Sequence, residues 1–108
     1  MRYCLALDLV DDEKMIQTYE EHHKTGRPEI IESIKKAGVT NMELYRVFDR
    51  LFMIMETDND FSFEEKEAMD RANPKVQEWE SLMSTFQKPL PKAKPGEKWV
   101  LMKKIFQL

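Results

Sequence analysis

The stretch "VTNMELYRVFDRLFMIMET", residues 39–57, decides the predicted fold because it indicates two β-strands joined by a very short connection. Apolar and polar residues alternate along residues 39–47, as they do in a strand with one covered face. Residues 50–57 are nearly all apolar, which is typical of a strand protected on both faces. Only Phe48 and Asp49 separate the two strands. A connection of this length predicts a β-hairpin.

The residues before the hairpin predict one strand and two helices. The apolar stretch 2–10, "RYCLALDLV", indicates a strand, and Asp11 or Asp12 can cap the helix that follows it. In that helix Met15, Tyr19 and His23 recur at a spacing of four, which places them on one side, facing the sheet. Gly26 ends this helix, and Pro28 suits the first turn of a second helix that ends at "KKAG".

The residues after the hairpin predict two more helices and a last strand. A helix starts near Ser62, and another follows Asn73 and Pro74. The second of these carries an apolar stripe at spacings of three and four: Val76, Trp79, Met83 and Phe86. A proline-rich loop then leads to "WVLMKKIF", residues 99–106, whose β-forming residues predict a final strand.

The order strand, helix, strand, strand, helix, strand predicts an α+β fold of the ferredoxin-like βαββαβ type, in a single domain over residues 1–108. Its antiparallel four-stranded sheet would carry the helices on one face. The other face is expected to hold Cys4, Ala6, Met53 or Met55, and Val100, which is too apolar to leave in water. We therefore expect a homodimer in which two sheets face each other as a dimeric α/β barrel.

Composition narrows the class of protein. Hydrophobic residues make up 42% of the chain and charged residues 34%, which is ordinary for a folded domain. The net charge of −3 gives no electrostatic basis for binding nucleic acid. No apolar run is long enough for a membrane span, and the first residues lack the long apolar region and small-residue cleavage site typical of a signal peptide. The single cysteine, Cys4, is expected to be buried and fits a reducing compartment, so we expect a cytoplasmic protein.

The candidate catalytic residue is His23, because histidine titrates near neutral pH and this one is predicted to face inward, one turn after Tyr19. An ordinary cation near a helix C-terminus is the alternative role for His23. His22 lies about 100° round the helix and is expected to point elsewhere. No metal-ligand spacing, glycine-rich phosphate loop or nucleophile motif is present, so acid–base chemistry without a metal or cofactor is expected.

Two residues of the late helix are candidates for contact with a ligand. Trp79 could be plain core or a platform for a sugar, since it lies within an apolar stripe. Its neighbour Glu80 would ordinarily face solvent. Arg27 could bind an acid, although a surface position is the more common one for arginine.

Taken together, these residues resemble the L-rhamnose mutarotase family along nearly the whole chain. The motifs are "Y-x-x-x-H" followed by "P-E" (Tyr19, His23, Pro28, Glu29), "G-x-x-N" before a strand (Gly38 to Asn41) and "Q-x-W-x-x-x-M" in the late helix (Gln77, Trp79, Met83). The resemblance implies a dimeric ferredoxin-like aldose 1-epimerase without a cofactor. Such an enzyme interconverts the α and β anomers of a 6-deoxy-L-hexose, with His23 as the acid and Tyr19 in contact with the sugar.

Three positions depart from the rhamnose-specific pattern of that family. Met42 replaces a tyrosine, Glu80 replaces the second of two consecutive tryptophans, and Arg27 replaces a tryptophan before the proline. The resemblance places Met42, Trp79 and Glu80 with Tyr19 as substrate-binding residues. A glutamate exchanges a stacking surface for an acceptor of hydrogen bonds from hydroxyls, and the run "ANPKVQEWESLM" is similar to the branch of the family linked to L-fucose. L-Fucose is thus the favoured substrate over L-rhamnose.

Two other classes of function share the predicted fold. A small dimeric αβ-barrel monooxygenase also needs no metal, but it oxidises aromatic substrates in an apolar pocket, which His23, Tyr19 and Glu80 would make polar. A non-catalytic ligand-binding module would tolerate replacement of His23 without losing a sugar-dependent activity. Solvent-facing Tyr19 and His23 side chains would favour this last class.

Overall fold

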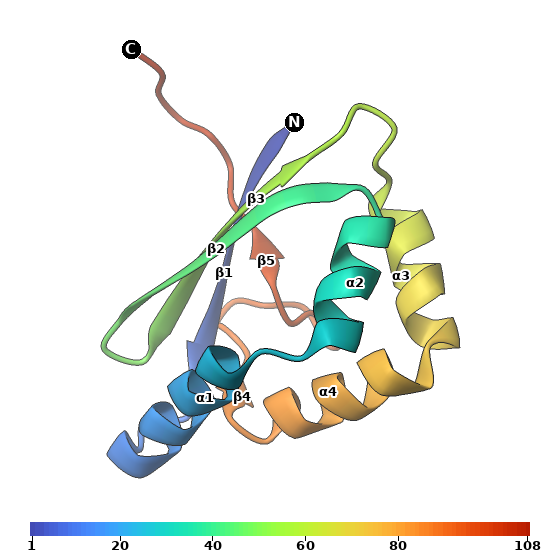
Figure 1. The fold of residues 1–108 in the computed structure, drawn as a ribbon. Coiled ribbons are helices and arrows are strands. Elements are labelled where there is room, and N and C mark those ends of the chain that lie inside the picture. The colour runs from blue at the N-terminus through green and yellow to red at the C-terminus, as the bar shows by residue number, and fades with distance from the viewer.

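The computed structural model describes residues 1–108 and contains one antiparallel sheet with four helices on one side (Figure 1). The elements in chain order are β1 (Arg2–Leu9), α1 (Glu13–Thr25), α2 (Pro28–Lys36), β2 (Val39–Val47), β3 (Arg50–Thr57), α3 (Phe63–Ala72), α4 (Pro74–Ser84), β4 (Gln87–Lys88) and β5 (Val100–Leu101). The predicted ferredoxin-like α+β fold is confirmed. None of the helices has the length and apolar character needed to cross a membrane.

The predicted hairpin forms the outer half of the sheet. Strand β2 pairs antiparallel with β3 up to Val47 and Arg50, and β3 pairs antiparallel with β1 in the middle of the sheet. Phe48 takes the left-handed backbone conformation in the turn, with φ of 53°. A two-residue hairpin turn commonly needs positive φ, which is rare outside glycine, asparagine and aspartate.

The predicted last strand is wrong in extent. Instead of one strand over residues 99–106, two short strands share the free edge of β1: β4 opposite Asp8 and Leu9, and β5 opposite Leu5 and Ala6. The Met102 amide still donates to the Cys4 carbonyl at 2.7 Å, and residues 103–108 then run away from the sheet to a free end (Figure 1). High β-propensity produces a strand only where a neighbouring edge accepts its hydrogen bonds. In this register residues 103 and 104 would face Tyr3 and Arg2, where β1 begins, so the residues after 104 have no strand opposite them.

The predicted helix starts are confirmed by their capping contacts. The Asp12 carboxylate accepts a hydrogen bond of 3.0 Å from the Met15 amide, and the Ser62 hydroxyl accepts one from the Glu65 amide. Asn73 caps α4 in the same way, and Pro28 occupies the first turn of α2. These local contacts satisfy backbone N–H groups that have no partner inside the helix.

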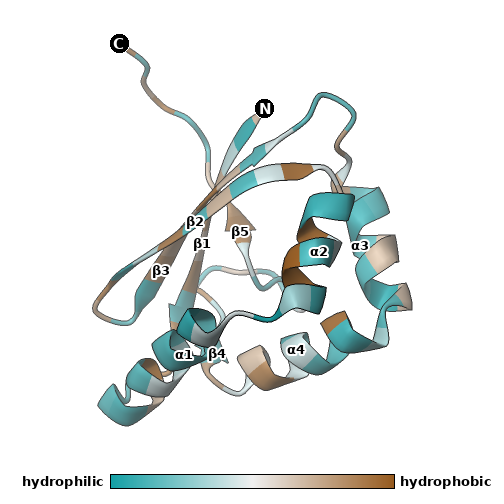
Figure 2. Cartoon of the chain, in the orientation of Figure 1, coloured by the Kyte–Doolittle hydropathy of each residue, from teal (hydrophilic) through white to brown (hydrophobic).

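The core lies between the sheet and the helices. Leu5, Leu7 and Leu9 of β1 are buried there, and the hydrophobic side of α2 is turned toward the sheet (Figure 2). Met53 and Met55 pair with Leu5 and Tyr3 in register, so they share this helix-covered face. The expectation that one of these methionines lies on the opposite face is therefore wrong.

The opposite face of the sheet carries no helix. Register places Cys4, Ala6, Phe52, Ile54 and Val100 on it, all half-buried. Cys4 is thus only partly covered, where full burial was expected. Arg50 and Asp8 form a two-pronged ion pair on the same face, with Nε to Oδ1 at 2.7 Å. This face is mostly apolar, as the sequence predicted.

Candidate active site

A cavity of about 360 Å³ lies between the sheet and the helix layer. Its 24 lining residues come from β1, β2, β3, all four helices and the segment 87–99, and 14 of them are hydrophobic. Small-molecule sites in proteins are typically concave, mainly apolar and of this size, with a few polar groups that orient the ligand. The polar groups of this cavity define what chemistry it can perform.

The imidazole of His23 is oriented by its own helix. Its Nδ1 lies 2.9 Å from the backbone oxygen of Tyr19. A carbonyl oxygen can only accept, so Nδ1 donates, and Nε2 makes no hydrogen bond within the chain. An imidazole held in this way can accept or deliver a proton at Nε2. The side chain lines the cavity but is more exposed than predicted, because it stands at the end of α1.

Tyr19 lies beneath His23, with only 3% of the residue exposed and 4.6 Å between the two ring centroids. Burial raises the pKa of the Tyr19 phenol, and a hydrogen bond from the Gln87 side chain partly opposes this rise. The phenol is therefore neutral at physiological pH. Its hydroxyl is a hydrogen-bond donor toward the cavity rather than a base.

Trp79 of α4 packs against the core and also lines the cavity. It packs against the buried cluster that contains Tyr19, and its ring centroid lies 5.4 Å from that of His23. The guanidinium of Arg27 lies 4.8 Å from the centre of the same ring, at the distance of a cation–π contact. Arg27 is half-buried against the cavity, where a surface position was expected.

His22 does not point away from the site, contrary to the prediction. It is half-buried and lines the cavity, with ring centroids 6.5 Å from Trp79 and 5.7 Å from Phe86. The helix step of about 100° does separate the two imidazoles. However, α4 and the residues after it pass the end of α1, so Trp79 lies beside both histidine rings and Phe86 lies beside that of His22. No hydrogen bond orients the His22 ring.

The remaining predicted site residues also line this cavity. Met42 is half-buried on the helix-covered face of β2, and Glu80 is exposed on α4. The structure thus gathers all five residues singled out from the sequence around one space. Their individual roles stay predictions.

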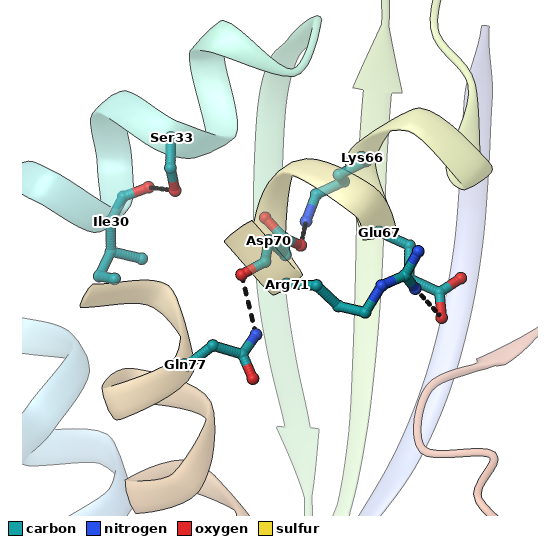
Figure 3. Close-up of polar contacts among 7 residues, drawn as sticks. All are labelled: Ile30, Ser33, Lys66, Glu67, Asp70, Arg71 and Gln77. Atoms are coloured by element: carbon teal, nitrogen blue, oxygen red, sulfur yellow. Dashed lines mark hydrogen bonds and ion pairs between the residues drawn. The ribbon is translucent and has the colours of Figure 1, made fainter. Parts of the chain in front are cut away.

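Several cavity residues were not predicted. Lys66 and Asp70 of α3 form an ion pair of 2.7 Å, and the Gln77 side chain donates to the Asp70 backbone oxygen at 2.8 Å (Figure 3). The spacing of four between Lys66 and Asp70 was the only available signal for that pair. No sequence pattern indicated that Gln87 lines the cavity, because it lies in β4, a strand that was not predicted. Nowhere do three His, Cys, Asp or Glu side chains gather as a metal ion would require.

The fold and the cavity define a ferredoxin-like α+β protein with an oriented imidazole in a pocket between sheet and helices. Residues 2–108 match the family model described as L-rhamnose mutarotase, and the chain belongs to this family. Mutarotases of this family are isomerases that act on sugars, and the chain is an enzyme of this kind.

A curated relative agrees with this assignment, and two solved structures share the fold. The chain is 42% identical over 109 residues to the L-fucose mutarotase of Xanthomonas campestris pv. campestris, covering 99% of this chain and 87% of that one. The crystal structure of an L-rhamnose mutarotase from Formosa agariphila superposes with a TM-score of 0.73 at 19% identity, over 100% and 98% of the two chains. The tetracenomycin F2 cyclase of Streptomyces glaucescens shares the fold with a TM-score of 0.62 at 19% identity, over 100% and 96%.

Proposed function

We propose that this enzyme interconverts the α and β pyranose anomers of a 6-deoxy-L-hexose, with L-fucose favoured over L-rhamnose, by acid–base ring opening. The observation that carries the proposal is the fixed imidazole of His23, whose Nε2 is free at the wall of a largely apolar cavity. An alternative role for His23 as a plain helix-end cation would not need a ring oriented toward a cavity. Family membership favours the mutarotase over a monooxygenase or a non-catalytic module.

In the proposed reaction the protonated form of His23 delivers a proton from Nε2 to the ring oxygen of the sugar, and a water molecule accepts the proton of the anomeric hydroxyl. The bond between the ring oxygen and the anomeric carbon breaks, which leaves an open-chain aldehyde. Rotation about the bond next to the aldehyde exposes its other face. On ring closure the attacking hydroxyl returns its proton to Nε2, and the proton held by water goes back to the carbonyl oxygen. No electrons are exchanged, so the reaction requires no redox partner. The neutral Tyr19 hydroxyl can donate a hydrogen bond to the sugar beside this centre.

The preference for L-fucose rests on the cavity residues that differ from the rhamnose-specific pattern. Glu80 offers a carboxylate that accepts hydrogen bonds from hydroxyls, and Met42 offers an apolar surface suited to the C6 methyl group. Trp79, with Arg27 on its ring, can pack against the apolar face of a pyranose. The L-fucose mutarotase name of the Xanthomonas relative supports the same preference.

The proposed reaction can be tested by exchange NMR on the anomeric protons of L-fucose and L-rhamnose. We expect the wild-type enzyme to accelerate the exchange between α and β anomers of both sugars, with the larger kcat/KM for L-fucose. D-Glucose, which carries a C6 hydroxyl and belongs to the other series, is the control and should exchange at its uncatalysed rate. Uncatalysed rates for both deoxy sugars would contradict the proposed function.

We also propose that two copies associate through the helix-free face of the sheet. This face presents Phe52 and Ile54 at its centre, and the exposed side chains of Tyr45 and Val47 extend the apolar surface. A charge placed on such a surface would have to be buried without a partner on association. When the same face of a second copy covers this surface, the apolar area of both copies is buried at once.

The variant Phe52→Asp is expected to sediment as a folded monomer, whereas the wild type sediments as a dimer. Phe48→Asp is the matched control, because Phe48 lies in the hairpin turn with 83% of its surface exposed and outside the paired strands. Circular dichroism reports whether each variant is folded. A wild-type protein that sediments as a monomer would contradict the proposed assembly.

A further inference from the structure

The side chain of Gln87 in β4 is part of the cavity wall, next to the phenol of Tyr19. Its amide nitrogen Nε2 donates to the Tyr19 hydroxyl oxygen at 3.3 Å. Its carbonyl oxygen Oε1 is buried and has no hydrogen-bond partner in the chain. Among all the buried side-chain oxygen and nitrogen atoms of the protein, this is the one left unpaired.

Turning the amide over does not remove the unpaired atom. The carbonyl oxygen would then accept from the Tyr19 hydroxyl, and the amide nitrogen would be buried without an acceptor. An unpaired buried polar group destabilises a folded chain, and an apolar side chain of the same size would avoid this cost. A polar group kept in such a position within a cavity indicates that a ligand completes its hydrogen bonds.

We propose that the Gln87 side chain turns on ligand binding so that Oε1, which is shielded from the cavity in this structure, accepts from a hydroxyl of the sugar while Nε2 positions the Tyr19 phenol. This inference rests on the proposed function and adds a substrate-binding residue to the same cavity. Because Tyr19 accepts from Gln87, its own O–H remains free to donate. Gln87 and Tyr19 therefore present an acceptor and a donor side by side, an arrangement that matches the donor and acceptor character of neighbouring sugar hydroxyls.

The arrangement predicts a large effect of one substitution on binding and a small effect on stability. In Gln87→Met the side chain keeps a similar length but loses both polar atoms. The KM for L-fucose should rise about 10- to 100-fold, the range expected when a buried hydrogen bond is lost, with a smaller change in kcat. The stability to urea should change little, because removing the unpaired carbonyl offsets the loss of the hydrogen bond to the Tyr19 hydroxyl. A residue that served only the fold would lose stability on this substitution.

The experiment measures anomer exchange by NMR and urea unfolding for the wild type, Gln87→Met and Gln17→Met. Gln17 is the matched control, because it is exposed on α1 outside the cavity and makes no hydrogen bond through its side chain. Gln17→Met should leave KM and kcat unchanged. An unchanged KM in Gln87→Met, or a marked fall in its stability, would overturn the inference.

Analogues of L-fucose identify the hydroxyl and separate this inference from the proposed function. Each analogue has hydrogen in place of the hydroxyl at carbon 2, 3 or 4. One analogue should bind more weakly than L-fucose to the wild type but equally well to Gln87→Met, because both partners of the same hydrogen bond are then removed. If the wild type accelerates the exchange but none of the three analogues shows this pattern, the inference is overturned while the proposed function stands. A wild type that does not accelerate L-fucose or L-rhamnose exchange would overturn both.

Discussion

Replacing His23 with alanine is expected to slow the catalysed exchange of L-fucose anomers by about 10²–10⁴-fold, the range that a positioned acid or base contributes. The loss should appear in kcat, because the imidazole is proposed to move a proton rather than to hold the sugar. His23 is exposed at the end of α1, so the variant should remain folded with nearly unchanged stability. Exchange NMR and urea unfolding measure the two effects separately.

The matched control is His22→Ala, which removes the neighbouring imidazole from the same cavity wall. We expect its rate to fall less than about tenfold, because no hydrogen bond orients the His22 ring, whereas Tyr19 fixes that of His23. A large loss in His22→Ala with little loss in His23→Ala would assign the proton transfer to His22. Full wild-type activity in both variants would exclude acid–base catalysis by histidine in this enzyme.

Replacing Leu9 with alanine is expected to lower the free energy of unfolding by about 2–5 kcal/mol, as truncation of a buried leucine usually does. Leu9 is 1% exposed and packs with Tyr19, Leu51 and Met83 in one cluster. The space left behind adjoins Tyr19, so the phenol should lose its fixed position. We therefore expect KM for the sugar to rise together with the loss of stability, measured by urea unfolding and NMR exchange.

Leu44→Ala provides the comparison for this effect. Leu44 lies on the helix-covered face of β2, but 37% of its surface is exposed, so part of its apolar area is already in water. The same truncation should therefore cost less stability than at Leu9. An equal cost at both positions would show that burial within the Tyr19 cluster is not what makes Leu9 important.

The parts of the fold that depend on neighbours in sequence were predictable. The hairpin followed from two apolar stretches with two residues between them, and the helix starts followed from Asp12, Ser62 and Pro28. Each of these signals acts over a few residues, through a hydrogen bond or a fixed dihedral angle. Tyr19 and His23 were placed together for the same reason, because a spacing of four stacks side chains along a helix.

The parts that depend on competition between distant segments were not predictable. Residues 99–106 have strand propensity along their length, but only Val100 and Leu101 form a strand on β1, which begins at Arg2 and leaves the residues after 104 without a strand opposite them. The sequence also left undecided which face of the sheet Met53 and Met55 occupy, because a shift of one residue in register moves every side chain of a strand to the other face. Pairing with Leu5 and Tyr3 settled that register.

The sequence by itself determined the α+β architecture, the hairpin and the histidine that faces the cavity, because periodicity and capping are local properties of the chain. Only the tertiary structure decided that His22 shares the cavity, that Arg27 stacks on Trp79, and that Gln87 joins Tyr19 with an unpaired carbonyl. These contacts join α1 to α4 and to β4, and 68 residues separate Tyr19 from Gln87. Their geometry depends on how whole elements pack, which no local pattern specifies.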